Sequence, residues 1–217
     1  MPACYNHLFV GLEEILESHR GWDPGALEVA SFLSAKLMAP LFKCETTRLL
    51  VEPNRSLTSE LLFSEYSQCL TSLEREEVLQ RHYFDHRNTV EDVIRKSSKK
   101  VLHLSIHTFT PIWNGTTRRV DLGLLFDPAR KSEAEFCELY LSKIRQSLAA
   151  FCIEFNEPYK GIDDGFTTYL RTMFSDEDYM GIEIEINQKY SGKKEWKMIS
   201  RSLSDALIKI LDTSTLS

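Results

Sequence analysis

The sequence lacks the features that mark membrane-spanning, secreted and disulfide-rich proteins. Its 217 residues contain no apolar run near the roughly 18 residues that a membrane-spanning helix needs. The first residues, MPACYNHLFVGLEEIL, have neither the basic start nor the long apolar stretch of a signal peptide. The five cysteines are odd in number, scattered and never in a CxxC pair, which is typical of reduced thiols. These absences predict a soluble cytoplasmic protein with no membrane partner.

Basic residues are too few for a nucleic-acid-binding protein. The formal net charge is −6 and no stripe of Lys and Arg is present, whereas phosphate binding needs a basic surface. Gly-rich phosphate loops, GxSxG elbows and HExxH helices are also absent. The chain is 42% hydrophobic and 27% charged, with no repeat or linker. We therefore expect residues 1–217 to form a single globular domain that does not bind nucleic acid.

Strand-like and helix-like patterns alternate along the chain. Apolar and β-branched runs predict strands over 46–52, 101–108, 120–128, 151–159 and 180–188. Helical patterns cover 24–38, much of 58–100 with a break near 83–86, 132–151, 163–174 and 194–211. The expected N-cap residues of these helices are Asp23, Ser59, Ser72, Asp163 and Asp164. The alternation predicts an α/β fold with a mainly parallel or mixed sheet flanked by helices.

Two histidines lie four residues apart in VLHLSIHTFTP, residues 101–111. On a helix they would share a face and grip one metal ion, but strand formers dominate the run and Pro111 closes it. Four residues of a strand span about 13 Å, whereas a zinc–nitrogen bond is about 2 Å, so one ion cannot take both. His107, at the carboxyl end where open α/β sheets place their ligands, is therefore the candidate. His103 is expected in the core or in support of the site.

Two glutamates share one face of the strand predicted in GIEIEINQ, residues 181–188. Glu183 and Glu185 are two residues apart, and isoleucines fill the other face. Buried carboxylates are costly unless they are paired or bound. The pattern fits an edge strand with a solvated face, or a strand in which one Glu is a general base of raised pKa.

Arginines follow or precede two of the predicted strands. In TTRLLVEPNRS, Arg48 comes early and Asn54 and Arg55 come just after the apolar run. Arg118 and Arg119 lie in the loop after the His107 strand. Arg offers a planar fork for a carboxylate and Asn a two-sided hydrogen-bonding group, so these residues suit an anionic amide. The alternative interpretation is ordinary surface polarity.

Six stretches, in order, carry a resemblance to a known family. They are SHRGWDPGALEVA (18–30), TTRLLVEPNRS (46–56), LSIHTFTP (104–111), RRVDLGLLFDP (118–128), EPYKGIDDG (157–165) and GIEIEINQ (181–188). Together they resemble the N-formylglutamate amidohydrolase family, whose fold is related to zinc-dependent exopeptidases and aspartoacylase-type deacylases. The resemblance implies a zinc-dependent hydrolase that cleaves an N-acyl amide of an acidic amino acid or a similar small anionic substrate.

The resemblance also implies roles for individual residues. His107 is similar to a zinc ligand and Glu185 to the catalytic glutamate that takes a proton from zinc-bound water. Arg48 is similar to an arginine that polarises the scissile carbonyl. Asn54 and Arg55 match a pair that grips substrate, and Arg118 is predicted to bind substrate with them.

One departure from the family pattern concerns the metal. Family members usually carry a Cys-Glu-His-type motif ahead of the region matched here, and this sequence contains no such segment, which predicts a chain shortened at its N-terminus. A catalytic zinc normally needs three protein ligands, so His7 and His19 would have to replace the missing ones. The alternative prediction is a non-catalytic relative that keeps an anion-binding site or acts as an interaction module.

Overall fold

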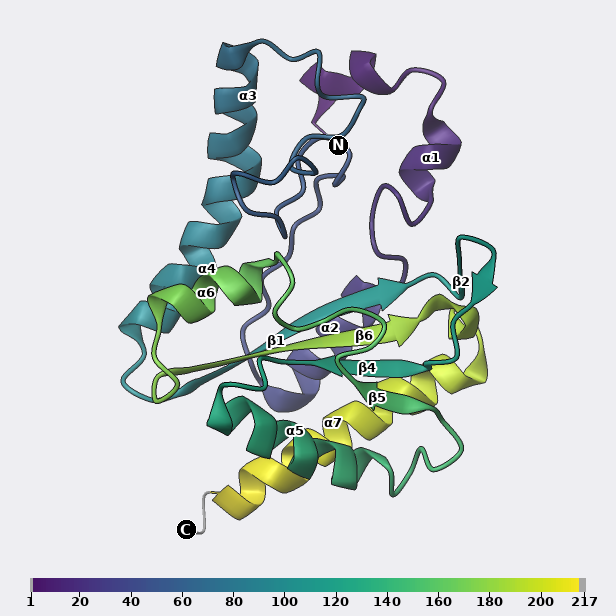
Figure 1. Cartoon of the computed structure of the whole chain (residues 1–217), viewed down its shortest axis with the longest axis vertical. Coiled ribbons are helices and arrows are strands. Elements are labelled where there is room, and N and C mark those ends of the chain that lie inside the picture. Colours follow the sequence, from purple (N-terminus) through teal and green to yellow (C-terminus); the bar gives the residue numbers. More distant parts are fainter. Residues whose placement is uncertain (1, 215–217) are drawn as a thin grey trace.

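The computed structural model describes residues 2–214, and a four-stranded sheet lies at its centre (Figure 1). Its strands are β1 (Val101–Phe109), β4 (Leu122–Leu125), β5 (Ile153–Phe155) and β6 (Tyr179–Asn187). Their order is β1-β6-β4-β5, with β1 parallel to β6, β4 antiparallel to β6 and β4 parallel to β5. The prediction of an α/β fold with a mixed sheet is confirmed.

The central strand β6 gives the sheet two unlike faces, because successive side chains of a strand point to opposite sides. Ile182, Ile184 and Ile186 point to one side and are fully buried in the main core. Three helices pack against this side: α2 (Ala26–Leu37), α5 (Lys131–Ile144) and α7 (Lys194–Ser214). The carboxylates of Glu183 and Glu185 are thereby directed to the opposite face.

That opposite face carries α6 (Phe166–Met173), and a further layer lies above the sheet in Figure 1. The upper layer contains η1 (Ala3–Phe9), α1 (Glu13–Glu17) and α3 (Ser72–Val78). The helix that begins with α3 continues without interruption through a π-helical segment, η2 (Leu79–Phe84), into α4 (Asp85–Lys96). A second hydrophobic cluster, including Tyr5, Phe9 and Tyr83, fills this layer.

The strand predicted at 46–52 is wrong. The segment forms a turn, in which the Leu50 amide donates to the Thr47 carbonyl at 3.0 Å. Leu49, Leu50 and Val51 are buried in the upper hydrophobic cluster. A short apolar run can be buried in a packed turn as well as in a β-sheet, so the apolar pattern alone did not distinguish the two and the strand prediction failed.

Several predicted helix starts are also wrong. Helix α2 begins after Gly25 with no side-chain cap, so Asp23 does not cap it. Thr71 rather than Ser72 caps α3, in a capping box with Glu74, and Gly165 rather than an aspartate precedes α6. Asx caps are local preferences, and tertiary contacts outweigh them here.

Other boundaries shift without changing the fold. Ser59 lies in a turn rather than at a helix start, and the break predicted at 83–86 is replaced by the continuous passage from η2 into α4. Strands β4 and β5 are shorter than the predicted 120–128 and 151–159, and helix α5 ends at Ile144.

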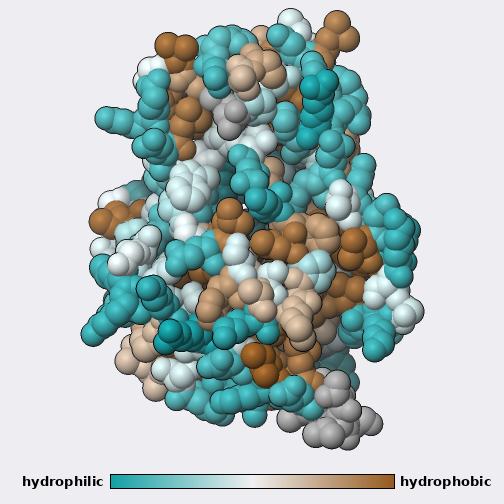
Figure 2. Space-filling view, turned by 180° about the vertical axis from the view of Figure 1, so that it is seen from behind, coloured by the Kyte–Doolittle hydropathy of each residue, from teal (hydrophilic) through white to brown (hydrophobic). Residues whose placement is uncertain are grey.

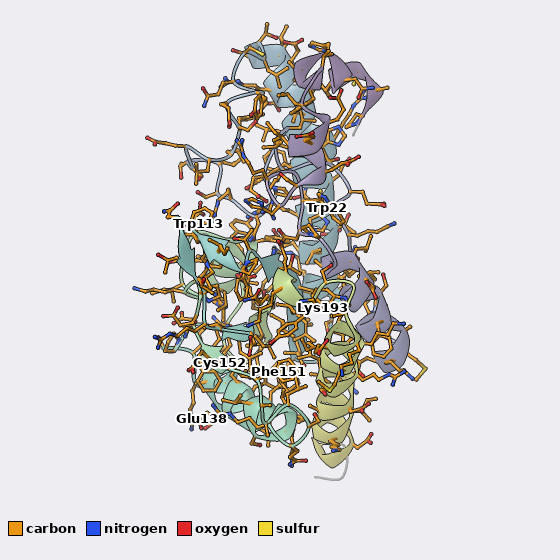
Figure 3. The ribbon with its side chains drawn as sticks, turned by 90° about the vertical axis from the view of Figure 1, so that its right-hand side faces the viewer. Trp22, Trp113, Glu138, Phe151, Cys152 and Lys193 are labelled. Carbon is orange, nitrogen blue, oxygen red and sulfur yellow. The ribbon has the colours of Figure 1, made fainter. Side chains whose placement is uncertain are left out.

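A small hairpin projects from the end of β1. It pairs β2 (Ile112–Trp113) with β3 (Thr116–Thr117), and a short 3-10 turn, η3 (Gln188–Tyr190), comes after β6. Figure 3 shows Trp113 on this hairpin and Trp22 on the loop before α2, at the level where the upper layer meets the sheet.

The surface opposite the view of Figure 1 is mixed in character. Hydrophobic residues gather around its middle and hydrophilic residues dominate elsewhere (Figure 2). Within residues 2–214, no helix has the length and apolar character required to cross a membrane.

Candidate active site

His107 and Glu185 stand side by side on one face of the sheet. They are register partners on the parallel strands β1 and β6, and Ser105 and Glu183 form the next pair along the same face. Because β6 lies between β1 and β4, it is not an edge strand. Glu183 and Glu185 are only 9% and 6% exposed. The interpretation of these glutamates as a solvated edge face is therefore wrong.

A chain of polar contacts runs outward from His107. Its Nδ1 lies 2.7 Å from Asp23 Oδ2, and its Nε2 lies 2.9 Å from Ser105 Oγ. Asp23 Oδ1 accepts from Arg48 Nη2 at 2.6 Å, and Arg48 Nε donates to Glu52 Oε2 at 3.0 Å. Neither Asp23 nor Ser105 was identified from the sequence as a site residue. The pairing of Asp23 with His107 across 84 positions has no local signal.

The surroundings raise the pKa values of both Glu185 and His107. Burial raises the pKa of Glu185 to about 7, with the charges of Asp23 and Glu183 adding to the effect and His107 opposing it. Glu185 Oε2 is buried without a hydrogen-bond partner among the described residues. Burial alone would lower the pKa of His107, but the hydrogen bond to Asp23 and the nearby carboxylates raise it to about 9. The pair is thus suited to opposite proton transfers.

His103 has a supporting place, as predicted. Its Nδ1 lies 2.8 Å from the Tyr179 hydroxyl, and its ring lies 6.2 Å from that of Phe166 on α6. Burial, helped by nearby cationic groups, lowers the pKa of His103 to about 4. This imidazole therefore stays neutral at physiological pH beneath α6.

The predicted pair Asn54 and Arg55 lies against the start of α6. Asn54 Oδ1 accepts from the Phe166 amide at 2.7 Å, and the Arg55 guanidinium donates to the Asp164 carbonyl. The Ser56 amide donates to the Asp164 carboxylate at 3.0 Å. Although the expected strand before it is absent, this segment is thereby fixed beside the sheet.

Gly165 lies next to both Asn54 and the buried Glu183. A Cβ atom at Gly165 would lie 3.4 Å from both Asn54 Oδ1 and Glu183 Oε1. Glu183 also accepts a hydrogen bond from the Thr167 hydroxyl. The structure therefore brings the predicted substrate-binding pair to the same face as Glu183 and Glu185.

Arg118 lies at the hairpin end of the same face. Its guanidinium is 5.4, 5.2 and 5.0 Å from the ring centroids of Phe109, Trp113 and Tyr159, and it donates to the Tyr159 hydroxyl at 3.0 Å. Phe109 is two residues beyond His107 on β1 and so shares its face. Arg119 is exposed.

The comparisons with known proteins decide the family. The model of the N-formylglutamate amidohydrolase family matches residues 6–191. The chain belongs to the N-formylglutamate amidohydrolase family. A solved structure, described as the crystal structure of gene product Atu2144 from Agrobacterium tumefaciens, is 26% identical, with a TM-score of 0.76. The alignment covers 97% of this chain and 86% of that one. A comparison with curated proteins gives no significant match.

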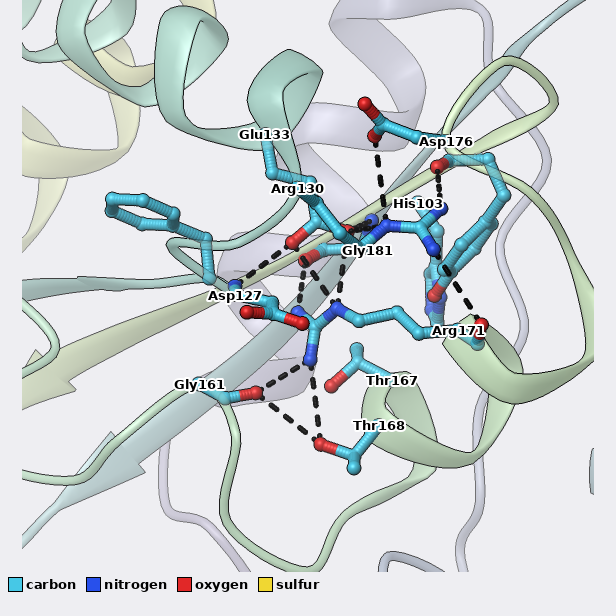
Figure 4. Close-up of polar contacts among 12 residues, drawn as sticks. His103, Asp127, Arg130, Glu133, Gly161, Thr167, Thr168, Arg171, Asp176 and Gly181 are labelled. Atoms are coloured by element: carbon cyan, nitrogen blue, oxygen red, sulfur yellow. Dashed lines mark hydrogen bonds and ion pairs between the residues drawn. The ribbon is translucent and has the colours of Figure 1, made fainter.

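In this member of the N-formylglutamate amidohydrolase family, a buried ionic network surrounds Glu133 and Arg171 (Figure 4). Fully buried Glu133 accepts from Arg171 Nε at 3.0 Å and from the Gly181 amide at 3.0 Å. Arg171 also donates to the carbonyls of Gly161 and Gly181, and Arg130 Nε lies 3.2 Å from Glu133. The network ties α5, α6 and the beginning of β6 together, and so fixes the strand that carries Glu185.

The described residues fall short of a three-ligand zinc site. No group of three or more His, Cys, Asp or Glu side chains within residues 2–214 is arranged to hold a metal ion. Both ring nitrogens of His107 are engaged, by Asp23 and Ser105. His7 and His19 are exposed and do not complete a site with His107. Both histidines therefore lie on the surface, and zinc binding by this chain stays a prediction.

Two surface hollows lie apart from these residues. One, of about 430 Å³, is lined by residues of the segment 41–46 and of the helix 81–89. The other, of about 860 Å³, is lined by residues of 150–151, 190 and 194–202. Neither is lined by a predicted site residue, so the cluster of titratable side chains, rather than a surface hollow, identifies the candidate site.

Proposed function

We propose that the protein hydrolyses the N-acyl amide of an acidic amino acid, with an N-formyl group as the first candidate. Membership of the N-formylglutamate amidohydrolase family supports the reaction class. The single observation that supports the assigned chemistry best is the register pair of His107 and Glu185, whose pKa values of about 9 and about 7 suit an acid and a base.

Glu185 is the proposed general base. In its carboxylate form it removes a proton from water as the oxygen attacks the amide carbon, and the free Oε2 is available for that hydrogen bond. The C–N bond of the resulting tetrahedral intermediate then breaks. His107, as an imidazolium whose Nδ1 is held by Asp23, gives its Nε2 proton to the leaving nitrogen, which replaces the Ser105 hydroxyl as the partner of Nε2. Proton transfer from Glu185 to His107, directly or through solvent, restores both groups.

Asp23 and Arg48 prepare this pair rather than react. Asp23 accepts from His107 and Arg48 at once, and these contacts hold the pKa of Asp23 below its ordinary value although burial opposes them. Since Arg48 is occupied by Asp23 and Glu52, its proposed effect on the scissile carbonyl is electrostatic. The predicted direct polarisation by Arg48 stays a prediction.

Two arginines provide the proposed anchors for substrate carboxylates. Neither Arg55 nor Arg118 forms an ion pair with another described residue, although each donates hydrogen bonds that fix its direction. Asn54, adjacent to Arg55, has an amide group that suits an acyl amide. A substrate with two carboxylates would use both arginines, which supports an N-acyl dicarboxylic amino acid.

Zinc dependence is a separate proposal that rests on family resemblance. His107 would be one ligand, and a bound zinc ion would supply Lewis acidity at the carbonyl. The donor set argues against a complete site in residues 2–214, so we assign no step to a metal. Metal analysis of the purified protein, together with zinc titration of the folded chain by calorimetry, tests this point separately from activity.

A non-catalytic relative is the second candidate, because the incomplete metal donor set and the anchored arginines fit an anion-binding protein. Incubation with N-formyl-L-glutamate separates the two. Release of formate that is lost in Glu185→Gln supports the hydrolase. Calorimetric binding without turnover, weakened in Arg55→Ala, would support the binding protein instead.

A further inference from the structure

Arg87 is a buried cation without an ion-pair partner among the described residues. It lies on α4 and is 4% exposed. Its guanidinium carbon lies 4.7, 4.3 and 4.5 Å from the ring centroids of Tyr83, Phe166 and Tyr169. Burial lowers its pKa. A buried charge is costly unless its surroundings compensate, so this placement needs an explanation.

The hydrogen bonds of Arg87 point to the segment that carries the proposed substrate anchor. Its Nη1 donates to the Pro53 carbonyl at 2.9 Å and reaches the Arg55 carbonyl at 3.5 Å. The hydroxyl of Tyr83 donates to the same Arg55 carbonyl at 2.8 Å. The carbonyls on both sides of Asn54 are therefore held by one helix.

The π-helical segment η2 lies in the part of the helix that carries these two side chains. Tyr83 belongs to η2, and Arg87 lies in the next segment, α4. Each residue added to a helix rotates all later residues by about 100° around the axis, so a π-turn redirects the helical face beyond it. Here that face is turned to the Pro53–Arg55 segment.

Arg87 also contacts the second element that holds the anchor. The ring of Phe166 lies over the Arg87 guanidinium, and the Phe166 amide donates to Asn54 Oδ1 at 2.7 Å. Arg55 donates to the carbonyl of Asp164, just before α6. Arg87 thus fills the junction between α4, α6 and the anchor segment, and its two hydrogen bonds to backbone carbonyls require an arginine rather than an apolar residue.

We propose that Arg87 is a positioning residue: with Tyr83, it fixes the backbone of Pro53–Arg55 so that Arg55 presents its guanidinium to a carboxylate of the substrate. The identity of that ligand rests on the proposed function, which this inference deepens. Arg87 itself does not touch the substrate. The bland alternative is that Arg87 only fills the core beneath α6.

Hydrogen–deuterium exchange tests the positioning step without any ligand. In Arg87→Met we expect the amides of residues 54–56 to exchange at least about tenfold faster than in the unchanged protein, while those of β6 are unaffected. Arg95→Met is the matched control, since Arg95 lies on the same helix but is exposed and paired with Glu91. Unchanged exchange at 54–56 in Arg87→Met would overturn the proposal.

Kinetics on N-formyl-L-glutamate separates positioning from core filling. We expect Arg87→Met to raise KM about tenfold with kcat changed less than about threefold, because binding rather than proton transfer is affected. Combined with Arg55→Ala, Arg87→Met should add little, whereas independent effects would multiply. Multiplying effects, or a loss confined to kcat, would contradict the role.

Two further variants cover the remaining outcomes. If Arg87→Met does not fold, Tyr83→Phe removes only the hydroxyl that holds the Arg55 carbonyl, and it should show the same faster exchange and raised KM in smaller degree; a value equal to the unchanged protein would overturn the proposal. If the unchanged protein has no hydrolase activity, the proposed function fails, and the exchange result alone decides the role of Arg87.

Discussion

The carboxylate of Glu185 and the imidazole of His107 occupy register positions on adjacent parallel strands, so the sheet itself sets their spacing. One partner is buried with a free oxygen, and the other is clamped by Asp23 at 2.7 Å. One face of the sheet carries the buried isoleucines of β6, and the other face carries His107 and Glu185 side by side, as an acid and a base. Their different pKa values lead to the first prediction.

The rate should depend on pH through two groups. Glu185 acts as a carboxylate, so kcat/KM rises as pH passes about 7, and His107 acts as an imidazolium, so it falls again above about 9. A pH profile of the metal-free protein from 5 to 10.5 measures both limbs. A rate that is constant over this range would contradict the assignment.

Asp23→Asn should leave less of His107 in the protonated form that acts as the acid. The amide removes the negative charge that raises the pKa of His107 and that pairs with Arg48. We expect kcat to fall about 10²-fold or more, with the alkaline limb moved to lower pH. Exposed Asp205→Asn on α7 is the control and should leave both unchanged. Titration of the His107 ring by NMR checks the pKa directly, and an unaltered value in Asp23→Asn would contradict this account.

Glu185→Gln should stabilise the fold while removing activity. The folded-state pKa of about 7 lies above the ordinary 4.5, so the folded state holds the proton longer and the free energy of unfolding decreases as pH rises from about 4.5 to 7. A glutamine at this position does not ionise, so the variant keeps its stability as pH rises. At pH 8 we expect the variant to be about 1–3 kcal/mol more stable in urea unfolding, with no such gain at pH 4. A gain of equal size at both pH values would rule out this explanation.

Glu133→Gln should destabilise the protein strongly. The carboxylate is fully buried between Arg171 and Arg130 and accepts the Gly181 amide. Removing one member of a buried ionic network leaves uncompensated charge and costs about 3–5 kcal/mol. Glu135→Gln, from the exposed pair with Lys131, should change stability by less than about 1 kcal/mol. Equal effects in the two variants would show that the network contributes little.

The sequence predicted the parts of this structure that depend on local periodicity. The period-two pattern predicted β1 and β6 and placed Glu183 and Glu185 on one face of β6. The length of four strand residues also showed that His103 and His107 are too far apart to bind one metal ion. It failed at 46–52, where an apolar run is buried in a turn. Local preference rules likewise made Asp23 a helix cap, although its partner lies 84 residues away.

Other site features had no sequence signal at all. The contacts of Arg87 with the carbonyls of Pro53 and Arg55 join residues more than 30 positions apart. Every residue type has a backbone carbonyl, so the sequence does not indicate which carbonyls Arg87 contacts. The π-helical passage through η2 similarly depends on packing rather than on a recognisable pattern. The sequence predicted Arg55 and Arg118 as substrate-binding residues because their chemistry suits an anion, and these roles stay predictions; their hydrogen-bond partners in the fold could not be predicted.

The most direct test of the central claim is formate release from N-formyl-L-glutamate at pH 8 by the unchanged protein, Glu185→Gln and the exposed control Glu138→Gln. We expect turnover in the unchanged protein and in Glu138→Gln, and a fall of about 10²-fold or more in Glu185→Gln. Equal rates in Glu185→Gln and the unchanged protein, or no turnover by a folded unchanged protein, would contradict the claim that Glu185 serves as the base of an amidohydrolase.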